Sequence, residues 1–236
     1  MDDELATAVR SLEAMPGTDG VHEPFLRGLM VDGVSVATLG ALLGTETVSS
    51  SDDLALRLDE LQFDLGEGPC WDSLSTGHPV LEPDVRAVRH GQWPAFSDAI
   101  SDLDLGAMFV FPLTVGPLRL GAVDLYTLRP QQLSDAEQGR ARVLAAAVSR
   151  HVLRRALADA GLDDEEPRES RWTRRAVHQA TGMVLAQLEA TPEDAHLILQ
   201  GHAFATGRSL REVADEVLSG GLSFTVTDGG IEDTAR

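Results

Sequence analysis

The sequence predicts an α+β protein: an antiparallel sheet with flanking helices, then a helical connector, then a C-terminal unit of three helices. Two apolar runs, at residues 107–113 and 120–126, are separated by a turn at Gly116 and Pro117 and predict a central β-hairpin. Residues 171–224 hold three segments with apolar side chains at helical spacing. Between these regions, Ser134 and Glu137 form a capping box that predicts a long helix running to about residue 160.

The N-terminal elements are predicted from local patterns. Residues 1–20 are expected to form a separate helical segment, because Leu5, Val9 and Leu12 share one side of a helix that Pro16 and Gly17 end. A second helix is expected at residues 21–30. Strands are expected at residues 32–39 and 46–49, where β-branched residues are frequent, and another helix at residues 54–63.

Residues 65–84 are the most distinctive part of the N-terminal region. A glycine-rich turn leads through Pro69 into a short helix that ends at Gly77, and a strand opens at residues 79–81. A further helix is expected at residues 93–101, before the hairpin. This stretch resembles the GAF domain, and we assign residues 21–160, connector helix included, to a GAF-like sensor domain.

The resemblance implies an antiparallel sheet that often forms a small-molecule pocket, although GAF domains serve many unrelated ligands. The candidate ligand contacts are Cys70, Trp71, His78, Trp93, Phe109 and Phe111. The alternative is that the aromatic side chains only fill the core and that Cys70 is a buried structural cysteine rather than a reactive thiol. No particular cofactor is implied.

Charge and a proline mark the boundary between the two regions. Residues 161–170 contain four consecutive acidic residues followed by Pro167, and we predict a linker there. Residues 225–236 are rich in Gly and Asp and are predicted to form a flexible tail.

Each C-terminal segment has its own start or stop signal. The second segment begins at Thr191 and Pro192 and ends at Gly207, and the third begins with a capping box of Ser209 and Glu212. None of the segments can bury its apolar stripe alone, so a compact three-helix unit follows. Residues 174–188, 191–195 and 203–214 resemble the ANTAR domain, a family of three-helix RNA-binding modules that act as transcription antiterminators.

The resemblance implies binding to RNA stem-loops in nascent transcripts, with no DNA partner expected. Guanidinium groups and a helix N-terminus can contact phosphates, and bases can stack on guanidinium planes or aromatic rings. The candidate RNA-binding residues are Arg171, Arg174, Arg175, Gln179, Arg208 and Arg211. Many family members carry basic residues where this chain has Thr181, Gln200 and Gly201. A module that has lost RNA binding and serves only in assembly is therefore the alternative.

The charge distribution is uneven. The net charge of -19 argues against non-specific nucleic-acid or membrane binding. Residues 1–167 contain 12 Arg and 28 acidic residues, whereas residues 168–222 contain 6 Arg and 7 acidic residues. The three-helix unit is thus close to neutral, which leaves room for a local Arg patch.

Further patterns bear on oligomeric state and location. Leu185 falls on the polar side of its helix, and Val177 and Leu188 widen the apolar arc beyond what three helices need. Together with the connector helix, this surface indicates a homodimer; the alternative is that the GAF-like domain covers it. Cys70 is the only cysteine, so a redox enzyme of the methionine sulfoxide reductase kind is a remote alternative and we expect no enzyme activity. The seven His show no metal-binding spacing, and with no signal peptide or membrane span visible we expect a cytoplasmic protein.

Overall fold

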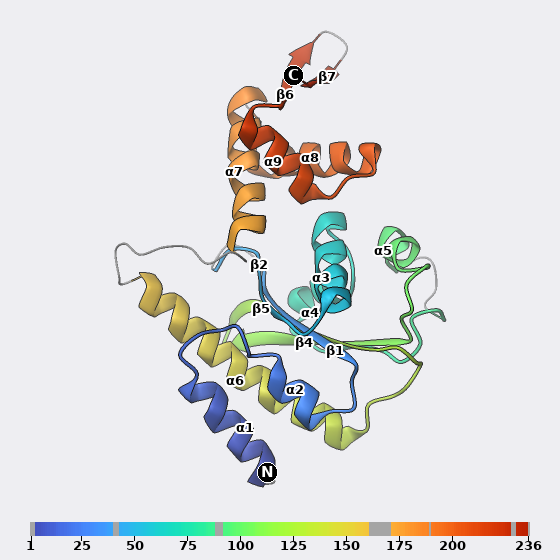
Figure 1. Ribbon diagram of the computed structural model, residues 1–236, viewed down its shortest axis with the longest axis vertical. Helices are drawn as coiled ribbons and strands as arrows, with labels where there is room; N and C mark the ends of the chain where they lie inside the picture. The colour runs from blue at the N-terminus through green and yellow to red at the C-terminus, as the bar shows by residue number, and fades with distance from the viewer. Residues whose placement is uncertain are drawn as a thin grey trace. The chain divides into compact units, whose positions relative to one another are not determined.

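The computed structural model describes residues 3–39, 43–87, 92–160, 171–188, 190–227 and 230–235. The chain divides into two compact units, Met1–Glu165 and Glu166–Arg236. The first unit contains the predicted sheet and its helices, and the second contains the predicted three-helix region (Figure 1).

The first unit is built on a five-stranded antiparallel sheet with the strand order β2-β1-β5-β4-β3. The strands are β1 (Gly33–Thr38), β2 (Glu46–Ser50), β3 (Val80–Glu82), β4 (Ala107–Val115) and β5 (Leu118–Thr127). In the hairpin, Val115 lies opposite Leu118, so the predicted turn at Gly116 and Pro117 is confirmed. The two most apolar strands occupy the interior of the sheet.

Helices cover both faces of this sheet. The helices are α1 (Asp3–Ala14), α2 (Glu23–Gly28), α3 (Asp53–Leu65), α4 (Pro69–Thr76), α5 (Pro94–Ala99) and α6 (Asp135–Ala160). Helices α1, α2 and α6 lie on one face, and α3, α4 and α5 lie on the other (Figure 1). The predicted capping box is present at α6, where the Glu137 amide donates to Ser134 Oγ at 3.3 Å. The N-terminal segment belongs to the same unit, because Leu12 of α1 is fully buried in its core.

Strand alternation divides the core into two layers. Phe109 and Phe111 of β4 belong to the cluster beneath α1, α2 and α6, whereas Met108 and Val110 belong to the cluster on the opposite face. Successive side chains of a strand point to opposite faces, so this division follows directly from the position of each residue in β4.

Close backbone packing between β1 and β5 requires a glycine. Gly121 has φ +159°, and a Cβ atom there would lie 1.9 Å from the carbonyl oxygen of Ala37. Real Cβ contacts are not this short, so any other residue at position 121 forces the two central strands apart.

Asp52 joins α3 to the sheet. Its Oδ1 accepts hydrogen bonds from the Ala55 amide and from the Tyr126 hydroxyl, both at 2.9 Å, and Ser51 Oγ donates to Oδ2. Burial acts to raise the pKa of Asp52, but the hydrogen bonds, that of Ser51 first, outweigh it and leave this pKa below its ordinary value. Burial and the Asp52 contact raise the pKa of Tyr126.

The second unit contains α7 (Arg171–Leu188), α8 (Pro192–Thr206) and α9 (Leu210–Ser219), followed by β6 (Leu222–Thr227) and β7 (Gly230–Ala235). In place of the predicted flexible tail, β6 and β7 form an antiparallel hairpin. The hairpin is tied to the helices at Phe224, whose amide donates to Gln187 Oε1 at 2.9 Å and whose ring meets His202 edge-on at 5.6 Å. The Gly- and Asp-rich composition of residues 225–236 did not indicate these strands. It also did not indicate that Leu222 and Phe224 of β6 are buried.

Candidate nucleic-acid interface

The three helices of the second unit enclose a small-residue core. Its buried side chains from the helices are Ala176, Val177, Ala180, Val184, Ala195, Leu199, Ala203, Leu210, Val213, Ala214 and Val217. Alanines at the contacts let helix backbones approach closely, because ridges and grooves of small side chains need little space. Leu222 and Phe224 of β6 add to this core.

Capping residues set the helix boundaries near the candidate interface. Thr191 Oγ1 accepts from the Asp194 amide at 3.1 Å and starts α8, as predicted. The capping box of α9 is complete, with the Ser209 amide donating to Glu212 Oε2 at 2.9 Å. The backbone and side-chain hydrogen bonds from Ser209 lower the pKa of Glu212. Gly207 and Gly220, at φ +64° and +76°, end α8 and α9 in the left-handed conformation.

The predicted RNA-binding residues differ in what their side chains contact. Arg208 Nη1 pairs with Glu216 Oε2, and its Nη2 donates to the Glu212 carbonyl at 3.2 Å. This guanidinium therefore joins the start of α9 to its second turn, and its charge is balanced within the unit. Arg211 is exposed, and its Nε lies 3.9 Å from Asp215 Oδ2, beyond hydrogen-bond distance.

Helix α7 carries the remaining candidates. Gln179 is exposed. The side chains of Arg171, Arg174 and Arg175 lie outside the described residues, although the backbone of α7 places these positions in its first two turns. The structure thus describes one exposed cation, Arg211, among the predicted contacts, and it assigns Arg208 a structural contact that the sequence did not indicate.

Thr181, Gln200 and Gly201 stand where many ANTAR domains have basic residues, and the three positions lie in different environments. Thr181 is 9% exposed and its hydroxyl donates to the Val177 carbonyl at 2.7 Å, so this position faces inward. Gln200 is half-buried. Gly201 is exposed, and a Cβ atom built on it meets no atom within 4 Å. Only the last position has open space for a longer side chain.

The protonation of His196 bears on the charge of the candidate interface. Burial first, and then the charge of His178, lower the pKa of His196, so His196 adds no positive charge at neutral pH.

Val177 is 2% exposed, and Leu185 and Leu188 are half-buried. Of the predicted apolar arc on α7, Val177 therefore belongs to the core, and Leu185 and Leu188 are only partly covered.

The candidate ligand contacts of the first unit do not converge on one pocket. Cys70 and Trp93 are buried on the face of α3, α4 and α5, with Trp71 packed beside them, whereas Phe109 and Phe111 lie on the opposite face. His78 is exposed. Phe109 and Phe111 therefore do not share a pocket with Cys70, Trp71 and Trp93 in this conformation, because alternate side chains of β4 point to opposite faces of the sheet.

A small void remains beside Trp93. It measures about 10 Å³ and is lined by Glu82, Phe96 and Met108 among others. Burial raises the pKa of Glu82 at its edge. A void of this size holds about one water molecule, so in this conformation the aromatic side chains act as core.

Residues 166–218 match the ANTAR domain family. The C-terminal helical unit is an ANTAR domain. The hairpin β6-β7 follows the matched residues and extends this ANTAR unit. Among curated proteins, none matches the chain.

The first unit has the fold of GAF domains. It is similar to the GAF domain of a phosphoenolpyruvate-protein phosphotransferase from Acinetobacter, with 14% identity and a TM-score of 0.53, covering 69% of this chain and 96% of that one. It is also similar to the GAF domain of the phosphoenolpyruvate-protein phosphotransferase from Coxiella burnetii, with 15% identity and a TM-score of 0.52, covering 67% of this chain and 95% of that one. At this identity the likeness concerns the fold.

The chain therefore combines a GAF fold with an ANTAR domain, an architecture of regulatory proteins. In the parts of the chain that the structure describes, no helix has the length and apolar character needed to span a membrane. Within the same described ranges, no three His, Cys, Asp or Glu side chains are grouped as metal ligands.

Proposed function

We propose that the protein is an RNA-binding transcription antitermination regulator, in which the GAF unit senses a signal and controls the ANTAR unit. The match of residues 166–218 to the ANTAR family carries this proposal. Its partners are stem-loops in nascent transcripts, so the site of action is the cytoplasm. The proposal assigns no enzymatic activity to the chain, and the 2% exposure of its only cysteine is in keeping with that.

The RNA contacts are proposed to come from α7 and from the start of α9. Arg211 and Gln179 supply exposed polar groups on these helices, and Arg171, Arg174 and Arg175 supply further positive charge in the sequence of α7. The surface ion pair of Arg211 with Asp215 is long and solvated, so exchanging it for a phosphate costs little. Arg208 acts by holding α9 in place.

We further propose that the protein is a homodimer that pairs through α6. Val143 and Leu157 of α6 are 38% and 66% exposed, and a separation of 14 residues places them near the same side of the helix. Pairing of two α6 helices would cover both side chains. A signal that changes this pairing then alters how the two ANTAR units are presented to RNA, provided that it favours one arrangement energetically.

The decisive experiment measures RNA affinity at two salt concentrations. The full chain is titrated with a pool of RNA hairpins, and then Arg174→Ala, Arg175→Ala and Arg211→Ala are compared with the wild type. Each phosphate contact that is removed should weaken binding and reduce the slope of log affinity against log salt by about 1. Arg86→Ala serves as the matched control, because Arg86 is an exposed arginine of the GAF unit with one distant acidic neighbour.

Arg208→Ala separates a structural role from direct contact. It should lower the melting temperature of the ANTAR unit, because Glu216 loses its partner, while the salt slope of any remaining binding stays that of the wild type. If no hairpin binds, or if the three variants keep the wild-type affinity and salt slope, the proposed RNA contacts are wrong.

A second candidate function is an assembly module without RNA binding. It is favoured by Leu197 and Phe204 of α8, which are 62% and 77% exposed, and by the internal pairing of Arg208. Exposed apolar side chains of this size on one helix suit a protein partner. Under this alternative Phe204→Ser changes the oligomeric state in sedimentation experiments, while hairpin RNA shows no salt-dependent binding.

A further inference from the structure

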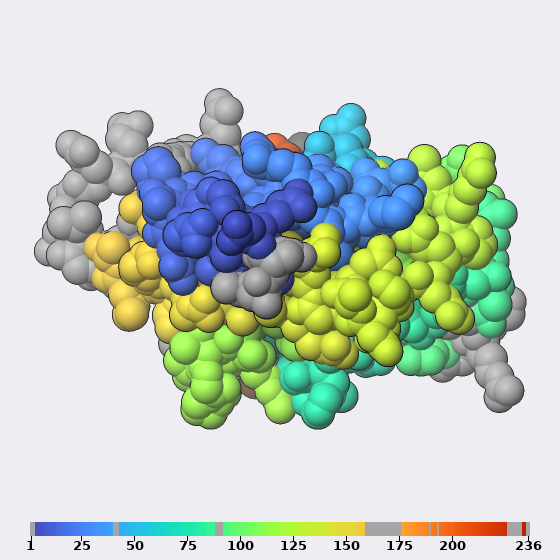
Figure 2. All heavy atoms as spheres, turned by 90° about the horizontal axis from the view of Figure 1, so that it is seen from below, coloured from blue at the N-terminus to red at the C-terminus, as the bar shows by residue number. Residues whose placement is uncertain are grey.

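A cavity lies between α1, α2 and α6, on the face of the GAF unit opposite Trp93. Its volume is about 460 Å³, within the range of roughly 300–1,000 Å³ that small-molecule sites occupy. Figure 2 shows the face of the unit where α1 lies along α6. The cavity has no connection to the six ligand contacts predicted from the sequence, none of which lines it.

The base of this cavity is apolar. Leu5 and Ala8 come from α1, Pro24 from α2 and Leu144 from α6, and Leu144 is 1% exposed. Gly28 contributes backbone only, and a Cβ atom there would lie 3.4 Å from the Cδ of Arg140. The apolar body of a ligand can therefore lie against three helices at once.

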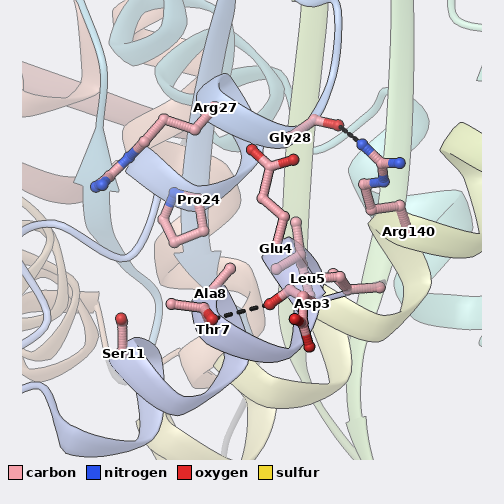
Figure 3. A pocket seen from close by; sticks show the side chains of 11 residues that line it. Asp3, Glu4, Leu5, Thr7, Ala8, Ser11, Pro24, Arg27, Gly28 and Arg140 are labelled. Carbon is pink, nitrogen blue, oxygen red and sulfur yellow. Dashed lines mark hydrogen bonds between the residues drawn. The ribbon is translucent and has the colours of Figure 1, made fainter. Parts of the chain in front are cut away.

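The charged residues at the rim are not equivalent. Arg140 Nη1 donates to the Gly28 carbonyl at 2.9 Å, so it is bound to the end of α2. Arg27 pairs with Glu23 of its own helix and points outward in Figure 3. The Glu4 side chain instead extends from α1 across the pocket toward α2 (Figure 3). Among the described residues, the Glu4 carboxylate has neither an ion pair nor a hydrogen bond.

The net charge of the GAF unit is negative, like the charge of Glu4. Residues 1–167 carry 16 more acidic residues than Arg. A carboxylate at the edge of an apolar cavity, in a strongly acidic domain, attracts cations and gives them a hydrogen-bond acceptor. Anions are disfavoured by the same field, and Arg140 is already bonded to the Gly28 carbonyl.

We propose that this cavity binds a small organic cation, a primary amine attached to an aromatic or aliphatic body. The ammonium group donates to the Glu4 carboxylate, and the apolar body packs on Ala8, Pro24 and Leu144. Such a ligand joins α1 and α2 to α6, the helix whose pairing the proposed regulation uses. Binding itself is independent of the RNA proposal and can be measured without RNA.

The test uses three probes of similar shape and different charge on the full chain. Phenethylamine, 2-phenylethanol and 3-phenylpropionate are titrated by calorimetry. The amine is expected to bind most tightly, the alcohol more weakly and the carboxylate weakest. Absence of amine binding at millimolar concentration, or binding of the carboxylate as tight as that of the amine, overturns the proposal.

Two variants locate the site. Glu4→Gln should weaken amine binding by about tenfold or more, because a charge-assisted hydrogen bond is lost, while binding of the alcohol stays the same. Ala8→Leu should abolish binding of both by filling the cavity, with the folded state checked by circular dichroism. Asp98→Asn is the control, since Asp98 is an exposed acid of α5 outside the cavity. Equal affinity of Glu4→Gln and Asp98→Asn for the amine shows that the site lies elsewhere.

Discussion

Gln62 offers the sharpest test of the GAF unit, because a single side chain satisfies buried groups on two other elements. It is fully buried on α3, its Oε1 accepts from the Cys70 amide at 2.8 Å, and its Nε2 donates to the Asp124 carboxylate of β5. Helix α4 has Gly68 at its N-cap position and no side-chain cap of its own, so Gln62 caps it from α3. A Cβ atom at Gly68 would lie 2.7 Å from Gln62 Cγ, which shows how tightly the amide is held.

The substitution Gln62→Met keeps the length of the side chain and removes the hydrogen bonds to Cys70 and Asp124, together with a long one to the Leu58 carbonyl at 3.4 Å. Loss of the cap costs about 1 kcal/mol. Loss of the donor to Asp124, which is 6% exposed, costs about 1–3 kcal/mol more, because a buried carboxylate is left with fewer partners. The free energy of unfolding of the GAF unit should therefore fall by about 2–4 kcal/mol.

The assay is urea unfolding followed by tryptophan fluorescence. The chain has three tryptophans, and a Trp172→Phe background leaves Trp71 and Trp93, which both lie in the GAF unit. The midpoint should move to lower urea with an unchanged slope. A change below about 0.5 kcal/mol, the range of ordinary surface substitutions, would show that Gln62 does not serve as the cap and carboxylate partner described here.

Three further predictions concern charge, pH and backbone space. Gly201→Lys should stabilise α8 by about 0.5–1 kcal/mol, because Gly is a poor helix former and this position is open, and it should raise hairpin RNA affinity with a salt slope steeper by about 1. Asp52→Asn should lower stability at pH 7. Since the folded-state pKa of Asp52 lies below its ordinary value of about 3.9, this difference should vanish in urea titrations as the pH falls through that lowered value. Gly121→Ala should prevent folding of the GAF unit, whereas Gly139→Ala, with open space in α6, should raise the melting temperature by a few degrees, and circular dichroism distinguishes the two.

The sequence predicted most elements because their signals are local. The capping boxes at Ser134 and Ser209 and the terminating glycines Gly77 and Gly207 act within one helical turn. These signals placed the helix boundaries close to those observed. The hairpin of β6 and β7 was missed because its strands are stabilised by contacts of Phe224 with α7 and α8, which composition does not show.

The candidate sites depended on contacts that the sequence does not contain. Arg208 was predicted to contact phosphate because of its charge and its place before α9, and only the fold brings Glu216 to it. Whether a charged side chain is available to a ligand depends on which partner the tertiary structure places beside it. The sequence carried no signal for the cavity beside Glu4, which three separate helices form.

The sequence by itself determined the two units and most of their elements, because hydrophobic periodicity and helix capping act over a few residues. The resemblance of residues 174–188, 191–195 and 203–214 indicated the family of the C-terminal domain. Only the tertiary structure decided which face of the sheet each aromatic side chain occupies, how Gln62 links α3, α4 and β5, and where a cavity forms between α1, α2 and α6. The physical reason is that burial, ion pairing and cavity volume are set by side chains far apart in the chain, and their distances exist only once the helices have packed on the sheet.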